Sequence, residues 1–473
     1  MNVLLVRPPD PLQHATLLSH TRPMNLACLA AVLRREGFGV TIADYETTPF
    51  SPDAYLRLLK ERAPAVVGVS CVTPTIRNGA KLCALAKEYD RNIVTVVGGP
   101  HANGLPEGTL AEFPSFDCLV FGEGEITLAE LCRRAADGSR EFAMPGVVHR
   151  KGDEIVTGPP RPLVADLDTL PFPARDLLDH RVQPGHSSRG FSNRAPSTEL
   201  YTSRGCPFGC SFCAIQSTFG RTVRFRSIPS LREEVDAIAA GRRFSHLVIA
   251  DDTFTLKADR AFEICDLLGR SGIASWNCDT RVTSVTKELL TAMRRSGCRK
   301  VAFGVESGSQ RVLDLIGKGI TADRVGQAVQ WAKEAGIGQI EGNFIIGSDP
   351  SETPGDLEMT RELIRSLPWT FISVSIIVPY PGTPVARRMR ELGLVPPGTA
   401  WEDYVMIGAR PAWRTQHFSS TELLRQQRRL TREFYLAPRY IARQLSSIRS
   451  LRELRYWASA GASYVRWHFS GRL

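Results

Sequence analysis

The chain has 473 residues, of which 43% are hydrophobic and 23% are charged. This length exceeds a single ordinary core and predicts two or three domains, and the apolar and charged fractions are typical of a globular rather than a disordered protein. No apolar run approaches the length of a membrane-spanning helix. The chain opens with a strand-like segment in residues 1–6 rather than with a signal-peptide pattern. We therefore expect a soluble, cytoplasmic protein.

The positive charge is concentrated near the C-terminus. The whole chain carries a formal net charge of +10. Residues 410–473 contain 13 arginines, three glutamates and neither lysine nor aspartate, so this segment alone carries +10. Residues 1–409 are therefore close to neutral, and the basic character belongs to the tail.

The first 150 residues alternate short apolar runs with helical patterns, such as the one at residues 24–35. Continuous apolar runs are typical of parallel strands that are buried on both faces. We therefore expect a doubly wound parallel α/β sheet in residues 1–150. Its strands are expected at residues 2–6, 40–43, 65–70, 93–97 and 118–121.

A second alternation of strand and helix patterns begins after residues 151–195. That stretch is rich in Pro, Arg, Asp, Ser and Gly and is interpreted as a connector. Six strands with helical crossovers predict a partial, open (β/α)6 barrel over residues 196–395, followed by a basic helical region over residues 396–473. The expected barrel strands are residues 199–202, 246–250, 275–278, 300–304, 339–346 and 372–378.

Three of the eleven cysteines are clustered, and the other eight are scattered among apolar residues. An odd number of cysteines without an export signal argues against a disulfide framework, so the scattered ones are expected to be buried thiols. Cys206, Cys210 and Cys213 are spaced four and three residues apart after the first barrel strand. Such thiols can ligate three irons of a cubane cluster and leave the fourth iron open. A structural zinc site would need a fourth ligand at customary spacing, which the sequence does not supply.

The segment RGCPFGCSFC, residues 204–213, resembles the CxxxCxxC signature of the radical S-adenosylmethionine (SAM) superfamily. The resemblance extends over residues 196–385. It implies a [4Fe-4S] cluster whose open iron chelates SAM. It also implies an external electron donor of the flavodoxin or ferredoxin type, which drives cleavage of SAM to a 5′-deoxyadenosyl radical.

Residues at the ends of the later barrel strands are expected to hold SAM, because active sites of such barrels lie at the C-terminal strand ends. The resemblance places the methionine part of SAM after the second strand and the adenosyl part on the fourth and fifth strands. An arginine after the third strand is expected to pair with the SAM carboxylate. The candidate SAM-binding residues are Asp251, Asp252, Arg281, Glu306, Ser307, Gly342 and Ile345.

Residues 1–150 resemble the cobalamin-binding domain that precedes many radical SAM barrels. The matching segments follow the first, third, fourth and fifth strands, where a doubly wound sheet binds its ligand. His101 is expected to be a loop residue rather than a cobalt ligand, because Gly99 stands where the cobalt-ligating motif Asp-x-His-x-x-Gly has its Asp. The candidate cobalamin-binding residues are Ser70, Thr73, Gly98, Gly99, Gly122 and Glu123.

The combined resemblance is to cobalamin-dependent radical SAM enzymes, and methylation of an unactivated carbon is the expected reaction. The first alternative is oxidative cyclisation or ring contraction with the same cofactors, as in the oxygen-independent magnesium-protoporphyrin ester cyclase. A tRNA methylthiotransferase-like enzyme would need further cluster cysteines in residues 1–150. A cobalamin sensor would account for those residues and leave Cys206, Cys210 and Cys213 unexplained.

Residues 431–441 resemble a segment near the C-terminus of several cobalamin-dependent radical SAM proteins, and arginines mixed with Trp and Tyr follow. This pattern fits helices docked on the barrel, an amphipathic helix at a membrane surface, or, as the weakest alternative, a nucleic-acid contact. The membrane alternative motivates the expectation of a hydrophobic or lipid-like small-molecule substrate.

Overall fold

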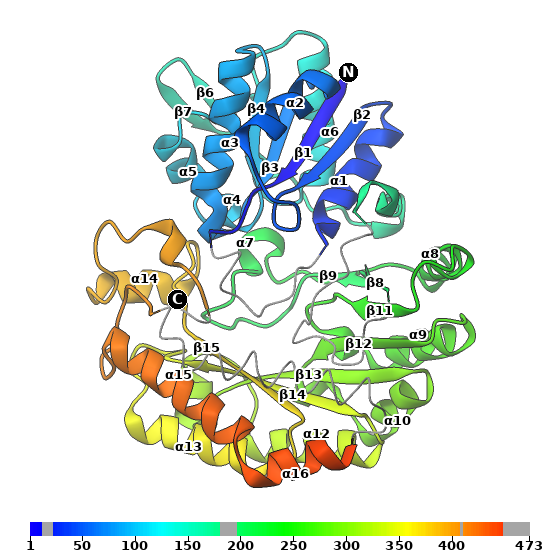
Figure 1. Cartoon of the computed structure of the whole chain (residues 1–473), viewed down its shortest axis with the longest axis vertical. Helices are drawn as coiled ribbons and strands as arrows, with labels where there is room; N and C mark the ends of the chain where they lie inside the picture. Colours follow the sequence, from blue (N-terminus) through cyan, green and yellow to red (C-terminus); the bar gives the residue numbers. More distant parts are fainter. Residues whose placement is uncertain (12–21, 180–195, 407–409, 448–473) are drawn as a thin grey trace.

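The structure is a computed structural model that describes residues 1–11, 22–179, 196–406 and 410–447. Two α/β units lie one above the other in Figure 1, with the N-terminal unit in blue and cyan and the second unit in green to red. A seven-stranded sheet forms the centre of the first unit and a six-stranded sheet that of the second. The expected combination of two α/β units is confirmed.

The N-terminal sheet has the order β2-β1-β3-β4-β5-β6-β7, and its first five strands are parallel. These strands are β1 (Asn2–Arg7), β2 (Gly39–Asp44), β3 (Val66–Ser70), β4 (Val94–Gly98) and β5 (Cys118–Val120). Helices α1 (Met24–Arg35) and α6 (Gly124–Ala136) bury apolar side chains on one face. The other face is covered by α2 (Pro52–Arg62), α3 (Ile76–Tyr89) and α5 (Pro106–Glu112). The sheet is therefore doubly wound, as the continuous apolar runs predicted.

The N-terminal sheet continues past residue 150, where the sequence predicted a connector. β6 (Val147–Lys151) pairs antiparallel with β5, and β7 (Glu154–Thr157) pairs antiparallel with β6. Both ends of β7 are exposed and polar, so it lacks the apolar run that marks the other strands. The hairpin covers the β5 edge of the parallel sheet.

The second unit is an open parallel barrel with the strand order β15-β14-β13-β12-β11-β8 and helices on its outer face (Figure 1). Its strands are β8 (Ser197–Leu200), β11 (His246–Ile249), β12 (Ser275–Thr280), β13 (Cys298–Glu306), β14 (Gln339–Ile346) and β15 (Phe371–Ile376). The helices are α8 (Ile228–Ala240), α9 (Ala258–Arg270), α10 (Lys287–Arg295), α11 (Gln310–Leu315), α12 (Ala322–Glu334), α13 (Pro354–Ser366) and α14 (Pro384–Glu391). β8 and β15 form the two edges, so the six-unit partial barrel is confirmed.

The C-terminal helices dock on this barrel. α15 (Ser420–Tyr435) lies along β15, and α16 (Pro438–Ser447) follows it (Figure 1). Phe434 and Tyr440 belong to the same apolar core as the barrel strands. Of the three alternatives for the tail, docking on the barrel is the one seen within residues 410–447. Residues 448–473 lie outside the described residues. Within the described ranges, no helix has the length and apolar character needed to cross a bilayer.

Side chains of α15 cover the open edge of the barrel. The Tyr435 hydroxyl accepts a hydrogen bond from the Ile372 amide at 3.2 Å and donates one to the Ile372 carbonyl at 2.8 Å. Gln427 donates to the Val374 carbonyl at 2.8 Å. These groups take the place of a neighbouring strand, which explains why β15 can remain an edge without exposing its backbone for pairing with another chain.

The C-terminal ends of the N-terminal strands face the barrel. α4 (Pro100–Gly104), directly after β4, packs against α7 (Gln216–Phe219) in the cysteine loop. Asn103 donates a hydrogen bond to the Thr218 hydroxyl at 2.6 Å. A Cβ on Gly104 would lie 2.3 Å from the Pro381 carbonyl oxygen, so the two units are in close backbone contact. The ligand-binding edges of both sheets therefore meet.

Substituting Tyr435 by Phe is expected to lower the free energy of unfolding of the barrel by about 1–2 kcal/mol, because two backbone groups of the edge strand lose their partner. Denaturant unfolding followed by fluorescence measures this change. The matched control is Tyr89→Phe, whose side chain is 45% exposed and whose substitution should leave the midpoint unchanged. Equal midpoints for both variants would contradict this role of Tyr435.

Candidate active site

The three clustered cysteines lie on a loop that is closed by a short antiparallel ribbon. The ribbon pairs β9 (Ser203–Arg204) with β10 (Arg224–Phe225). Gly205 enters the loop with φ of +94°, and a Cβ there would lie 2.1 Å from the Thr222 carbonyl oxygen. Only glycine permits so tight a closure, which holds the two ends of the loop together.

The backbone around Cys210 is fixed by later segments of the barrel. The Ser211 amide donates to the Ile316 carbonyl at 3.0 Å, and the Val385 amide, at the start of α14, donates to the Ser211 carbonyl at 3.0 Å. Within the loop, the Cys213 amide donates to the Cys210 carbonyl at 3.1 Å. The second and third cysteines are therefore held on a braced turn.

Polar side chains from two strand ends approach the thiols. The Thr253 hydroxyl, beyond β11, lies 4.0 Å from Cys206 Sγ. Arg281, directly after β12, directs Nη1 toward Cys210 Sγ at 3.9 Å. Its guanidinium also stacks on Phe208, with Cζ 3.6 Å from the ring centroid. The buried Arg281 guanidinium is therefore close enough to stabilise a negative charge on Cys210 Sγ.

Asp251 and Asp252 differ in their surroundings although they are neighbours. Asp251 accepts four hydrogen bonds of 2.5 to 3.1 Å from the amides and hydroxyls of Thr202 and Ser203, so its oxygens hold the junction before the cysteine loop. Asp252 reaches solvent but is largely surrounded by protein. This desolvation and the charge of Asp251 raise the pKa of Asp252 to about 6, against the lowering effect of the Gly205 amide.

Glu306 forms a buried ion pair at the end of β13. Its carboxylate lies 2.6 Å from Lys318 Nζ, and the two side chains are 8% and 7% exposed. Glu306 has φ of +72°, a conformation that costs energy for a residue with a Cβ and that is found most often at functional sites. The Lys318 carbonyl accepts a hydrogen bond from Arg281, so Arg281, Lys318 and Glu306 form one connected set beside Cys210.

Ser307 turns away from the cysteines. It is fully buried, its hydroxyl lies 3.1 Å from that of Thr360 on α13, and it accepts a hydrogen bond from the Ser309 amide. Gly342 also faces the helical layer, because a Cβ there would lie 2.8 Å from the Phe344 ring. Ser307 and Gly342 therefore do not approach the thiols in this structure. Glu306 and Arg281, by contrast, lie close together beside Cys210.

A row of half-exposed residues lines the inner face of the barrel. Alternate residues of a strand point to the same face of the sheet. One set, which includes Phe303, packs against the helices outside the barrel, and the other set faces inward. The half-exposed residues on the inner set are Glu199, Val248, Asp279, Gly304, Asn343, Ile345, Ser373 and Ser375. Gly304, Asn343 and Ser373 are register partners on adjacent strands. Ile345, a predicted site residue, therefore lies on the partly polar inner face of the barrel.

Small residues form the C-terminal edge of the N-terminal sheet. Gly99 follows β4 with φ of +96°, and a Cβ there would lie 2.8 Å from the Cys71 carbonyl oxygen and 2.9 Å from Ser70 Oγ. Gly98 ends β4 beside Ser70 of β3. A Cβ on Gly122 would meet nothing within 4 Å, so open space lies beside it. Gly99 therefore allows β3 and β4 to pack tightly at their ends, and Gly122 leaves space for a ligand beside the sheet edge.

Thr73 and His101 lie in a sealed contact instead. The Thr73 hydroxyl is 3.3 Å from His101 Nδ1, and His101 is 1% exposed. Burial lowers the pKa of His101 to about 4. Trp401 packs edge-on against the imidazole at 4.8 Å between centroids and donates to the Glu112 carboxylate at 2.9 Å. The C-terminal region therefore returns to seal this part of the N-terminal unit.

Glu123 is engaged by the barrel rather than open at the sheet edge. Its carboxylate lies 3.0 Å from Arg204 Nη1 and 2.7 Å from Arg224 Nη1. The amide of its neighbour Gly122 donates to Asn103 Oδ1 at 2.8 Å. A cobalamin contact by Glu123 stays a prediction, and the structure gives this carboxylate a different set of partners.

The models of two protein families together match most of the chain. Residues 14–132 match the B12 binding domain, and residues 200–364 match the Radical SAM superfamily. The chain is also 32% identical over 447 residues to an uncharacterized methyltransferase of Pyrococcus horikoshii, a match that covers 94% of this chain and 95% of the relative. The chain belongs to the cobalamin-dependent radical SAM enzymes.

Other relatives of this radical SAM enzyme have different reactions in their names. The anaerobic magnesium-protoporphyrin IX monomethyl ester cyclase of Rubrivivax gelatinosus is 29% identical and covers 83% of this chain and 70% of its own length. The hopanoid C-3 methylase of Methylococcus capsulatus is 28% identical, with 81% and 71% covered. The solved structure of the cobalamin-dependent SAM radical enzyme OxsB has a TM-score of 0.75 at 18% identity, covering 99% of this chain and 72% of that one, and shows a shared fold.

The enzyme uses a [4Fe-4S] cluster, SAM and cobalamin, and the residues present fit each group. Cys206, Cys210 and Cys213 are free thiols on one braced loop. Among the described residues, no three His, Cys, Asp or Glu side chains converge on a single metal ion. In a cubane each thiolate binds a different iron, and the loop supplies three thiols.

The SAM and cobalamin positions also offer suitable groups. Arg281 Nε is buried and has no hydrogen-bond partner among the described residues, so it can donate to an anionic group such as a carboxylate. The inner barrel face supplies polar side chains beside it. At the N-terminal sheet edge, the open space beside Gly122 leaves room for a large ligand, and Ser70, Gly98 and Gly99 lie on the neighbouring strand ends.

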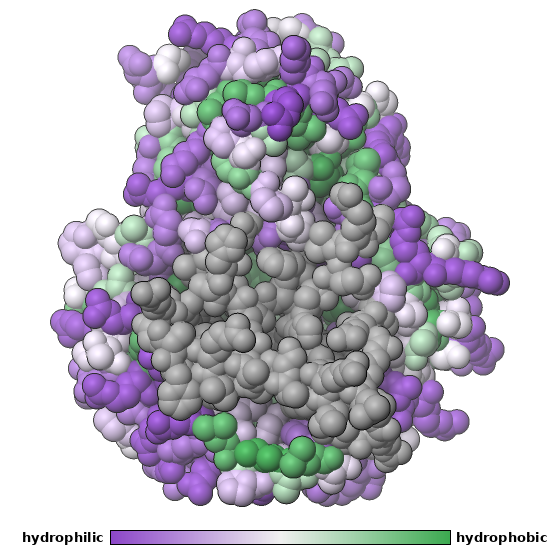
Figure 2. All heavy atoms as spheres, in the orientation of Figure 1, coloured by the Kyte–Doolittle hydropathy of each residue, from purple (hydrophilic) through white to green (hydrophobic). Residues whose placement is uncertain are grey.

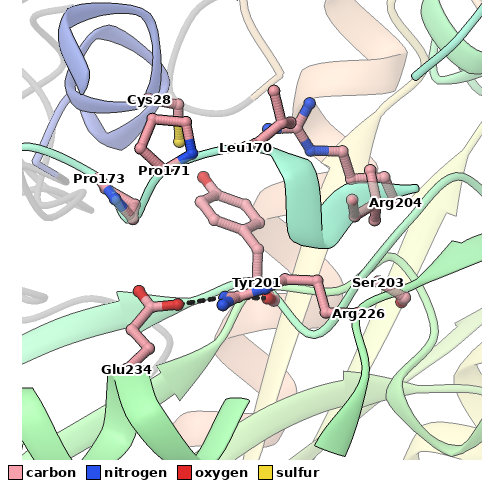
Figure 3. Close-up of a pocket in the computed structure, with 10 residues that line it drawn as sticks. Cys28, Leu170, Pro171, Pro173, Tyr201, Ser203, Arg204, Arg226 and Glu234 are labelled. Carbon is pink, nitrogen blue, oxygen red and sulfur yellow. Dashed lines mark hydrogen bonds and ion pairs between the residues drawn. The ribbon is translucent and has the colours of Figure 1, made fainter. Parts of the chain in front are cut away.

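A separate pocket lies where α1, the connector and the barrel meet (Figure 3). Its empty space, including the part that is open to solvent, is about 400 Å³, and none of its lining residues is a clustered cysteine. In Figure 3 the Tyr201 ring points toward Cys28, and Glu234 pairs with Arg226 below it. Arg204, which precedes the cysteine loop, also lines this pocket.

Several residues of the site were not found from the sequence. Lys318 is flanked by Gly317 and Gly319, both with positive φ, and this Gly-Lys-Gly segment was the available signal. The inner-face residues Asn343 and Ser373 could have been found from the alternation of polar and apolar residues along β14 and β15.

Replacing Cys206, Cys210 or Cys213 individually by Ala is expected to remove most of the iron, because a cubane held by three thiolates loses a third of its protein ligands. Iron and sulfide per chain, measured after anaerobic reconstitution, test this. Cys265→Ala is the matched control, since this thiol is buried in the barrel core on α9. Full iron content in a loop variant would contradict the assigned ligands.

Proposed function

We propose that this enzyme methylates an unactivated carbon of a small, largely apolar molecule. The observation that carries the proposal is the match to a protein named as a methyltransferase over nearly the full length of both chains. The meeting of the N-terminal sheet edge with the barrel supports it, because a methyl carrier must reach the carbon that the radical site activates. Small-molecule substrates are also named for the relatives.

When bound, the cluster and SAM supply hydrogen abstraction from carbon, and cobalamin supplies the methyl group. The protein's own residues position these groups. Arg281, stacked on Phe208, offers Nε to an anion beside Cys210. The Glu306–Lys318 pair fixes the end of β13 next to Arg281. Asn343 and Ser373 present polar groups to a molecule on the inner barrel face, and reduction of the cluster requires an external donor, which we propose to be a flavodoxin or ferredoxin.

Cyclisation with the same cofactors is the second candidate, because the ester cyclase matches 83% of this chain. A methylthiotransferase-like activity has less support. The five cysteines of the N-terminal unit lie on or beside its helices and strands, and four of them are buried. Burial raises the pKa of Cys132 to about 12, which disfavours the thiolate that a cluster ligand requires.

Product analysis separates methylation from cyclisation. The anaerobic holoenzyme is incubated with reductant, SAM carrying a deuterated methyl group, and a deproteinised small-molecule extract of the source cells. We expect S-adenosylhomocysteine and 5′-deoxyadenosine together, with the deuterated methyl group in a product. The Cys206→Ala variant is the control and should form no 5′-deoxyadenosine. 5′-Deoxyadenosine without S-adenosylhomocysteine during turnover would exclude methyl transfer and favour cyclisation.

We also propose that α16 contacts a membrane surface, which would give access to a hydrophobic substrate. Ile441 and Leu445 are 43% and 59% exposed on this helix. A strip of apolar residues crosses the lower part of the molecule in Figure 2, where Figure 1 places α16. Arg432 and Arg439 are exposed nearby, as expected for a helix that lies on anionic lipid.

Flotation of the full-length protein with vesicles of phosphatidylserine and phosphatidylcholine tests this contact. Ile441→Asp/Leu445→Asp is expected to reduce the bound fraction at least about fivefold, since two anchoring side chains become anionic. Met359→Asp, at another exposed apolar residue of the barrel, is the matched control and should float like the unchanged protein. Equal flotation of the α16 variant and the control would contradict the contact.

A further inference from the structure

Two arginines stand directly opposite each other at the base of the cysteine loop. Arg204 on β9 and Arg224 on β10 are register partners in the two-stranded ribbon, and Cys206 follows two residues after Arg204. Their side chains are only 16% and 8% exposed. Like charges directly opposite in a ribbon repel, and burial increases the cost because water screens them less. The closure of the loop therefore needs a counter-charge.

That counter-charge comes from the N-terminal unit. Glu123 bridges the two arginines, with one carboxylate oxygen 3.0 Å from Arg204 and the other 2.7 Å from Arg224. Glu125 adds a contact of 2.6 Å to Arg204. Both carboxylates are buried, and they belong to the loop and first turn after β5, the strand that leads to the cobalamin-binding edge. Two positive and two negative charges thus close the ribbon.

The connector joins the same arrangement. The Val164 amide donates to Glu123 at 2.8 Å, and the Val164 carbonyl accepts from Arg224 at 2.8 Å. Burial alone would raise the pKa of Glu123, but the hydrogen bonds from Arg224, Val164 and Arg204 hold it below the ordinary value. Glu123 is therefore ionised at neutral pH, when it neutralises the ribbon.

We propose that Glu123 and Glu125 are positioning residues for the iron–sulfur cluster, through which the cobalamin-binding unit holds the cysteine loop closed. They act through Arg204 and Arg224 and touch neither cluster nor substrate. The contacts between the units at Asn103, Gly104 and Trp401 do not reach the ribbon. Loss of the carboxylates leaves two buried guanidiniums facing each other at the entrance to Cys206, so the loop opens and the cluster is lost faster.

The test is the rate of iron release to a ferrous-iron chelator from the reconstituted full-length protein, without substrate or cobalamin. Glu123→Gln is expected to release iron at least about tenfold faster, because removing one partner of a buried ion pair costs more than the ~1.4 kcal/mol that a factor of ten represents. Glu125→Gln removes one of two partners of Arg204 and should give a smaller acceleration. Electron paramagnetic resonance of the reduced cluster should change in Glu123→Gln.

A double variant separates positioning from general destabilisation. In Glu123→Gln/Arg224→Met the repulsion is absent, so iron release should return to within about threefold of the unchanged protein, a non-additive result. Glu130→Gln is the matched control, since Glu130 lies on the same helix as Glu125 and pairs with Arg134 of that helix and Arg161 of the connector, away from the ribbon. Iron release from Glu123→Gln at the unchanged rate, or no recovery in the double variant, would overturn the proposal.

This inference rests on the cofactor assignment within the proposed function but not on the reaction. The measurement uses the cluster alone, so a normal iron-release rate in Glu123→Gln with intact methyl transfer would refute only the positioning role. Failure to form S-adenosylhomocysteine would leave the positioning role standing.

Discussion

The site depends on the contact between the C-terminal ends of two sets of parallel strands. Each set alone provides loops that can hold a cofactor, but cofactors on separate units act on one substrate only if the units are fixed face to face. Gly104 and Pro381 approach so closely that a single methyl group would not fit between them. The two units thus meet through direct backbone contact at this point.

Buried polar groups then give this contact its register. Glu123 crosses from the N-terminal unit to the ribbon beneath the cysteine loop, and Trp401 crosses from the C-terminal region back to Glu112 and His101. Within the barrel, Asp251 ties the end of β8 to the end of β11. Groups of this kind are costly when unpaired, so they favour one arrangement of the units over others that bury similar apolar area.

The sequence predicted the strands because parallel strands buried on both faces must be continuously apolar. The assignment of Cys206, Cys210 and Cys213 as cluster ligands rests on their specific spacing and stays a prediction. It could predict Arg281 and Glu306 from their places after strand ends, but not the partners that polar residues find across the two units. Glu123 and Arg204 are 81 positions apart, and no local pattern reveals that they are partners. Ser307 follows Glu306 directly, yet the two side chains point in different directions. Glu306, which has a positive φ, pairs with Lys318, whereas Ser307 faces Thr360 on α13. β7 was missed because a short, half-exposed edge strand needs no apolar run.

The central claim is that one chain holds an iron–sulfur cluster and cobalamin on facing edges. Iron, sulfide and cobalt content of protein purified without oxygen from cobalamin-fed cells tests it most directly. We expect about four irons, four sulfides and one cobalt per chain. A full cluster without cobalt, even after reconstitution with cobalamin, would contradict the claim and reduce the N-terminal unit to a scaffold for the barrel.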